Sequence, residues 1–164
     1  MTDHRLIANG EMHLTGPVGS LDWDGEGFTV RDVTEALSEM DGDITVKINS
    51  GGRFAFDGIA IHSLLRQYDG EVTTVAQGIA ASAASVIFMA GEDRVMAEGA
   101  MLMIHDASGI TMGTETDHLK TAKGLGKLSN SLAGIYARAT SRGIDVERAA
   151  MREETWLDGA EAVE

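Results

Sequence analysis

The chain has 164 residues, 43% of them hydrophobic, which is enough for one globular domain with a sizeable core. It contains no cysteine, which excludes disulfides and cysteine-ligated zinc and fits a reducing cytoplasm. The formal charge of −13, from 13 basic and 26 acidic residues, repels phosphate backbones, so nucleic acid is not expected as a partner.

The sequence shows no sign of a membrane segment or of export. No apolar run approaches the roughly 18 residues that a membrane-spanning helix needs. The amino end, Met1 to Arg5, lacks the basic-then-apolar pattern of a secretion signal. We therefore expect a cytoplasmic location and no membrane partner.

Strands and helices are expected to alternate along the chain. We expect strands at Glu11 to Thr15, Ile44 to Ile48, Val72 to Gln77, Arg94 to Glu98 and Met101 to His105. We expect helices at about Arg31 to Met40 after a Thr29 cap, Gly58 to Tyr68 after an Asp57 cap, Ala83 to Ala90, Glu115 to Ser141, and a short helix to about Arg152 after an Asp145 cap. After the extended segment Glu153 to Leu157, Asp158 caps a last helix, and the sequence stops inside it, which indicates a truncated helix. This order predicts an α/β fold with mostly parallel strands, in a single domain over residues 1–164.

The stretch Gly78 to Ser85 is built almost wholly from Gly, Ala and Ser. Small side chains are needed where a strand turns sharply into a helix and another backbone comes close. Ser82 lies at this turn, where the unpaired N–H groups and the positive dipole end of the helix favour negative charge. Its hydroxyl is therefore either a capping group or a nucleophile.

His105 follows the next long strand, and reacting groups gather at the carboxyl ends of strands in open α/β sheets. A serine hydroxyl needs a neighbouring imidazole to take its proton, and the imidazole needs an acceptor on its far nitrogen. The acids considered for this role are Asp106, Glu153, Glu154 and Asp158. In a continuing strand Asp106 points to the face opposite His105, which counts against it.

Catalysis of acyl transfer also needs backbone donors for the oxyanion. The N–H of Ala83, directly after the serine, is one candidate. The N–H of Gly52, in the glycine turn after the Ile44 to Ile48 strand, is another, because a residue without a side chain lets a carbonyl approach closely.

Each of these residues also has an ordinary structural interpretation. Ser82 alone reads as an N-cap, His105 as a hydrogen-bonded core histidine, and Glu154 as a solvated surface acid. Ser85, one helical turn after Ser82, is the competing serine, and we expect it to be buried in packing. The other histidines show no spacing typical of metal ligands, so we expect no metal and no cofactor. The order of these features along the chain, a glycine turn, a serine turn, a histidine and a late acid, favours a catalytic role over the structural interpretations.

These segments resemble the ClpP-type serine peptidases, and in particular the ClpP-like head-maturation (prohead) proteases of tailed phages. The resemblance lies in Ile48 to Gly52 with Asp57 to Ile61, in Gly78 to Ser85, in Met103 to His105, and in Glu153 to Leu157 with Ala160 to Glu164. It covers most of the chain from about Met12 onward. It implies the ClpP/crotonase-like fold of repeated strand-strand-helix units, self-assembly into rings, and a triad of Ser82, His105 and Glu154.

Three positions depart from the housekeeping peptidase of this family. Ala84 replaces a glycine, Arg53 replaces the second glycine of the turn, and Glu154 replaces an aspartate. The assignment of an oxyanion donor in the glycine turn therefore rests on Gly52 alone, and the donors implied by the resemblance are Gly52 and Ala83.

We thus expect an ATP-independent serine endopeptidase that cleaves capsid or scaffold proteins during phage head maturation. No feature of the chain implies a partner unfoldase. One alternative is a crotonase-like enzyme acting on acyl-CoA, which uses backbone oxyanion donors and carboxylates without a serine–histidine pair. The other is a non-catalytic assembly or scaffold protein with the same fold.

Overall fold

The computed structural model describes residues 6–19 and 27–163. The chain divides into two compact units, residues 1–103 with 156–164 and residues 104–155. Residues 1–5, on which the expectation about a secretion signal rests, lie outside the described part.

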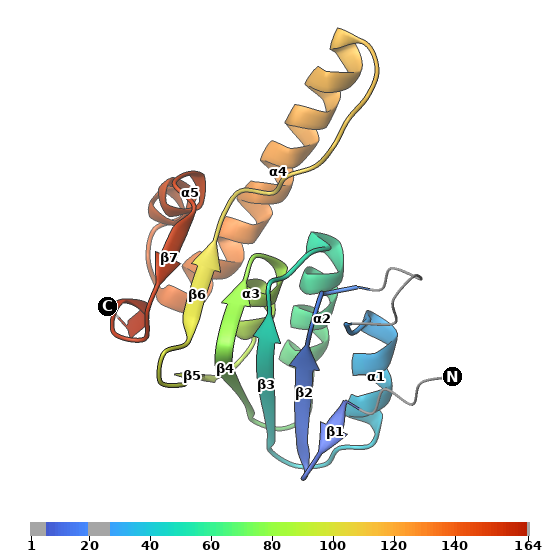
Figure 1. The fold of residues 1–164 in the computed structure, drawn as a ribbon, viewed down its shortest axis with the longest axis vertical. Coiled ribbons are helices and arrows are strands. Elements are labelled where there is room, and N and C mark those ends of the chain that lie inside the picture. Colours follow the sequence, from blue (N-terminus) through green and yellow to red (C-terminus); the bar gives the residue numbers. More distant parts are fainter. Residues whose placement is uncertain (1–5, 20–26, 164) are drawn as a thin grey trace. The chain divides into compact units, whose positions relative to one another are not determined.

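The first unit is built on a seven-stranded sheet (Figure 1). Its strands are β1 (Ile7–Ala8), β2 (Glu11–Thr15), β3 (Ile44–Ser50), β4 (Val72–Ala81), β5 (Asp93–Met96), β6 (Met101–Ile104) and β7 (Thr155–Leu157). They lie in the order β1-β2-β3-β4-β6-β7, and β5 pairs with β4. Strand β1 is antiparallel to β2, whereas the β2–β3, β3–β4, β4–β5 and β4–β6 pairs are parallel. The predicted α/β fold with mostly parallel strands is confirmed.

Three helices form a layer against one face of this sheet (Figure 1). They are α1 (Val30–Ser38), α2 (Ala55–Arg66) and α3 (Ala83–Phe88), and a short 3-10 helix, η1 (Glu161–Val163), ends the described chain. Alternate residues of the strands are fully buried, among them Leu14, Val46 and Ile48. Thr29 caps α1 as expected, in a capping box with Asp32.

Strand β4 is longer than predicted. We expected it to end at Gln77, but it continues through Gly78 to Ala81. The extension is paired, because Ile79, Ala80 and Ala81 lie opposite the first three residues of β6. A side chain at Gly78 would lie 2.9 Å from the Asn49 side-chain oxygen, beside the register shift in β3. The glycine thus lets β4 pass this irregularity instead of ending the strand.

Helix α2 begins three residues earlier than predicted, and Asp57 is not its cap. The N-cap position is Phe54, and Asp57 lies in the first turn, where its charge still favours the helix dipole. Gly58 therefore lies inside the helix. Its missing side chain lets α2 approach α3, because a Cβ there would lie 2.8 Å from the Ala83 carbonyl oxygen.

The second unit contains α4 (Glu115–Thr140) and α5 (Ile144–Arg152), which pack against one another. Asp145 lies in the first turn of α5 and does not cap it, since Gly143 holds the N-cap position. A capping box that we did not predict joins Thr114 and Asp117 at the start of α4. The Thr114 hydroxyl and N–H donate to the Asp117 carboxylate, and these bonds hold the pKa of Asp117 below its usual value.

The segment that precedes α4 lies along that helix (Figure 1). The hydroxyl of Thr121 donates to the Thr111 hydroxyl at 3.2 Å, and a Cβ at Gly109 would contact Leu125 at 3.7 Å. Two apolar side chains of this segment, Ile110 and Met112, are 98% and 91% exposed. Within the described residues, no helix is both long enough and apolar enough to cross a membrane.

The packing of Gly58 generates a prediction about stability. Gly58→Ala should lower the free energy of unfolding by about 1–3 kcal/mol, because the new methyl group is forced against the Ala83 backbone. Gly124→Ala in α4 is the matched control. A Cβ there meets nothing within 4 Å, so alanine should raise the free energy of unfolding by up to about 1 kcal/mol. Urea unfolding of both variants checks this, and equal effects at the two sites would contradict the packing argument.

Candidate active site

Ser82 lies at the sharp junction between β4 and α3. Its backbone has φ 56° and ψ −123°, a conformation that residues other than glycine rarely adopt. The backbone is held there by the Ser82 N–H, which donates to the Met103 carbonyl of β6 at 2.9 Å. Although Ser82 occupies the N-cap position, its side chain makes no capping hydrogen bond. The capping interpretation is therefore wrong, and the geometry is that of a strained strand–turn–helix elbow.

Ser85, the competing serine, is fully buried. Its hydroxyl donates to the Ser82 carbonyl oxygen at 2.6 Å, and its N–H donates to the same oxygen at 3.0 Å. The prediction that Ser85 is a buried packing residue is confirmed. Its hydrogen bonds also help to fix the turn that presents Ser82.

Gly52 lies directly against this turn. A Cβ built on Gly52 would lie 2.8 Å from both the Ala83 nitrogen and the Ser82 Cβ, and 2.5 Å from the Ala81 carbonyl oxygen. Its φ is +84°, which independently favours glycine. The first unit thus brings together Ser82 and the two backbone segments considered for an oxyanion site. The Gly52 N–H itself donates to the Ser50 hydroxyl at 3.1 Å.

Arg53 has φ 153°, within the range that glycine adopts far more readily than other residues. Glycine, which the resemblance puts at this position in the housekeeping peptidase, adopts such a φ without strain. The guanidinium of Arg53 lies 5.3 Å from the centre of the Phe54 ring, a cation–π arrangement.

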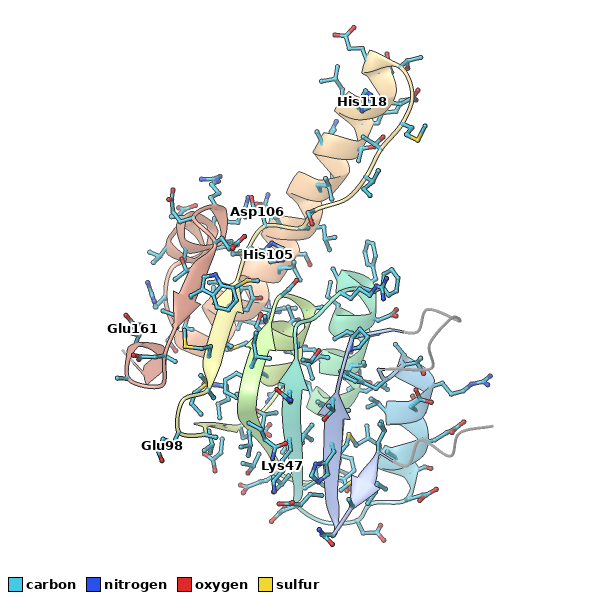
Figure 2. The ribbon with its side chains drawn as sticks, viewed as in Figure 1. Lys47, Glu98, His105, Asp106, His118 and Glu161 are labelled. Atoms are coloured by element: carbon cyan, nitrogen blue, oxygen red, sulfur yellow. The ribbon has the colours of Figure 1, made fainter. Side chains whose placement is uncertain are left out.

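His105 follows β6 and belongs to the second unit (Figure 2). The chain directly after it is tied to the two helices of that unit. The Asp106 N–H donates to the Met151 carbonyl at 3.1 Å, and the Ala107 N–H donates to the Ser129 hydroxyl at 3.0 Å. The position of the imidazole therefore depends on α4 and α5.

Glu154 follows the last turn of α5 and has a left-handed backbone, with φ 51°. Glycine is the usual residue at this position after a helix, so a glutamate here stores strain. The Glu154 N–H donates to the Met151 carbonyl at 3.3 Å. One carbonyl oxygen thus accepts hydrogen bonds from the residue after His105 and from Glu154, which brings these two parts of the second unit together.

The structure engages two of the other acids in different roles. The Asp106 carboxylate binds the guanidinium of Arg148 through both of its oxygens. Asp158 accepts hydrogen bonds from the N–H groups of Ala160 and Glu161, both at 2.9 Å, and so caps η1 as expected. Glu153 is the C-cap residue of α5.

Strained backbone gathers at the candidate positions. Among the described residues, the non-glycine residues with positive φ are Asn9, Arg53, Ser82, Ser141 and Glu154. Three of these five lie in segments that the sequence singled out for chemistry. Because such conformations cost free energy and persist where the surroundings hold them, this distribution supports a functional role for the segments.

Sequence reasoning missed Arg148, the partner of Asp106. Its spacing of three residues from Met151 puts both on the inward face of α5, but nothing in the sequence pairs Arg148 with Asp106. Elsewhere, the described residues contain no group of three or more histidine, aspartate or glutamate side chains arranged to hold a metal ion.

Residues from about a fifth of the way along the chain to its end match a known family. The Clp protease family model matches residues 32–164, a range that includes all of the second unit, most of the first, and every candidate site residue. The fold described above is consistent with that match. The chain therefore belongs to the Clp protease family and is a serine peptidase of the ClpP kind.

Proposed function

We propose that Ser82 is the nucleophile of this peptidase, that His105 is its general base and acid, and that Glu154 orients the imidazole. The observation that carries the proposal is the conformation of Ser82: its backbone is strained and held by β6, and its side chain makes no capping hydrogen bond. The family match and the order of the three residues along the chain support it. We also propose that residues 1–164 form a single peptidase domain.

In this mechanism the Ser82 hydroxyl attacks the peptide carbonyl while His105 takes its proton. The negative charge on the tetrahedral intermediate is stabilised by the Ala83 N–H and the positive end of α3. The Gly52 N–H is the second donor if it exchanges the Ser50 hydroxyl for the oxyanion. His105 then returns the proton to the leaving amine, and water hydrolyses the acyl-enzyme.

We also propose the biological setting of the reaction. The quoted segments resemble those of phage prohead proteases, which supports capsid or scaffold proteins as substrates during head maturation. In that setting the peptidase acts without ATP in the cytoplasm of the host cell. The excess of acidic over basic residues supports protein substrates in preference to nucleic acid.

Self-assembly is the third part of the proposal, since ClpP-like proteins typically form oligomeric rings. In the second unit, Ile110 and Met112 lie on the segment along α4, and Leu119 of α4 is 64% exposed. Large apolar side chains that are this exposed, within ten residues of the sequence, are typical of an interaction surface. We propose that a second copy of the chain covers them.

Ser82→Ala should abolish reaction with a fluorophosphonate probe, because the probe reports an activated serine. Ser82 and Ser85 fall in the same tryptic peptide, residues 67–94, so peptide mass alone does not distinguish them. Ser85→Ala is the matched control and should still be labelled. Labelling of Ser82→Ala, or its loss in a folded Ser85→Ala protein alone, would contradict the assignment.

His105→Ala should slow labelling by ~10³-fold or more, and Glu154→Gln by ~10²-fold or more, because each removes part of the activation of Ser82. Asp158→Asn is the control for the third member, since asparagine caps η1 as well as aspartate, and labelling should stay within about twofold. The measurement is the second-order labelling rate at neutral pH. A larger loss in Asp158→Asn than in Glu154→Gln would transfer the third role to Asp158.

Ile110→Asp should shift the protein to smaller species in analytical ultracentrifugation, because a charge cannot be buried in an apolar interface without a partner. Ile110→Leu, which keeps the apolar surface, should assemble like the parent protein. A parent protein that sediments as a monomer would exclude self-assembly. A parent oligomer that Ile110→Asp leaves intact would exclude this surface.

A further inference from the structure

We propose that Arg148 is a positioning residue for the catalytic histidine and its acid. It acts through Asp106, by holding the chain that follows His105 on the last turn of α5, beside the turn that carries Glu154. This inference rests on the proposed function, since it assigns how the second unit prepares His105 and Glu154 for their roles. It concerns contacts within residues 104–155 alone.

The ion pair between Arg148 and Asp106 is bidentate: it joins two guanidinium nitrogens to the two carboxylate oxygens. Nη1 of Arg148 donates to Oδ1 of Asp106, and Nη2 donates to Oδ2 at 3.2 Å. A bidentate pair of this kind fixes orientation as well as distance, which a lysine cannot do. Figure 2 shows Asp106 next to His105, where β6 passes into the segment that leads to α4.

The backbone completes the tie. The N–H of Asp106 donates to the Met151 carbonyl, three residues after Arg148 in the same helix, and Nη1 of Arg148 lies 4.0 Å from the Met151 sulfur. The Glu154 N–H donates to the same Met151 carbonyl. Any shift of Asp106 along α5 therefore disturbs the Met151 carbonyl, which also accepts the hydrogen bond that holds the strained turn at Glu154.

The pair is not arranged for stability alone. The Arg148 side chain is 11% exposed, and within the described part of the chain its Nε is buried without a hydrogen-bond partner. Burying a guanidinium with an unsatisfied donor costs free energy, and apolar residues of similar volume often stabilise such a site better. The arrangement is understandable if the geometry that it fixes is needed next to His105.

A second arginine that forms an ion pair with a residue of α5 provides a control. Arg142 lies 3.5 Å from Glu147 of α5 through its Nε, so it also forms an ion pair to this helix. Arg142 is half-exposed, and its ion pair is with Glu147 and not with Asp106. Loss of Arg142 therefore removes an ion pair from the α5 region without touching the tie beside His105.

The experiment compares Arg148→Met, Arg148→Lys and Arg142→Met in the full chain. In the first measurement, amide hydrogen exchange at Asp106 and Glu154 should be at least about tenfold faster in Arg148→Met and unchanged in Arg142→Met. In the second, the labelling rate at saturating fluorophosphonate should fall about 10- to 100-fold in Arg148→Met, with the half-saturating concentration unchanged. Arg148→Lys should recover part of both effects, because it keeps the charge but only one bond.

Unchanged exchange in Arg148→Met, or faster exchange with a saturating rate equal to that of the parent protein, would overturn the proposal. If Arg148→Met does not fold, Asp106→Asn replaces it, since asparagine keeps the shape and the backbone bond but loses the charge. A parent protein that the probe does not label would instead overturn the proposed function. The two failures are therefore distinguishable.

Discussion

The backbone conformation of Ser82 is the constraint on which the rest of the first unit depends. A serine at φ 56° and ψ −123° costs on the order of 1–3 kcal/mol, so its surroundings must hold it there. The extension of β4 beyond Gly78 does this, because pairing with β6 ends in the bond from the Ser82 N–H to the Met103 carbonyl. Gly52 closes the other side, where any side chain would overlap Ala81 and Ala83. The long β4, the short α3 and the glycine turn are parts of one arrangement that presents a hydroxyl.

The second unit also holds a residue in a strained backbone conformation, in this case after a helix. Glu154 has a left-handed backbone after α5, and the bond to the Met151 carbonyl holds it. That carbonyl also receives the N–H of the residue after His105, so two segments separated by almost fifty residues share one acceptor. Buried Tyr136 and Met151 give α4 and α5 the firm packing that such sharing requires. Each unit thus places its candidate groups on helix ends and strand ends supported by packed core.

Most helices and strands of the fold could be predicted from local sequence patterns. Alternating apolar residues marked β2 and β3, and the Thr29 cap marked α1, because these signals act over a few residues. The predicted end of β4 before Gly78 and the predicted start of α2 at Gly58 were wrong, because these boundaries do not depend on neighbouring residues in the sequence. In each case a distant segment decides the conformation, the Asn49 side chain at Gly78 and the Ala83 backbone at Gly58. The same limit applies to the site: Ser82 could be named from its small neighbours, whereas the pairing of Asp106 with Arg148, 42 residues apart, leaves almost no local pattern.

Arg53 shows how a departure from a family pattern can be accommodated. Its φ of 153° would suit glycine, and the arginine forgoes that freedom. Two hydrogen bonds flank it, from the Val18 N–H to the Gly52 carbonyl and from the Phe54 N–H to the Val18 carbonyl, so the backbone is fixed on both sides. The side chain meanwhile lies over the Phe54 ring and remains exposed. The strain therefore falls on one residue, while the neighbouring Gly52, which must stay free of any side chain, keeps its close contact with the Ser82 turn. A substitution that the conformation disfavours is tolerable here because the close approach depends on the residue before it.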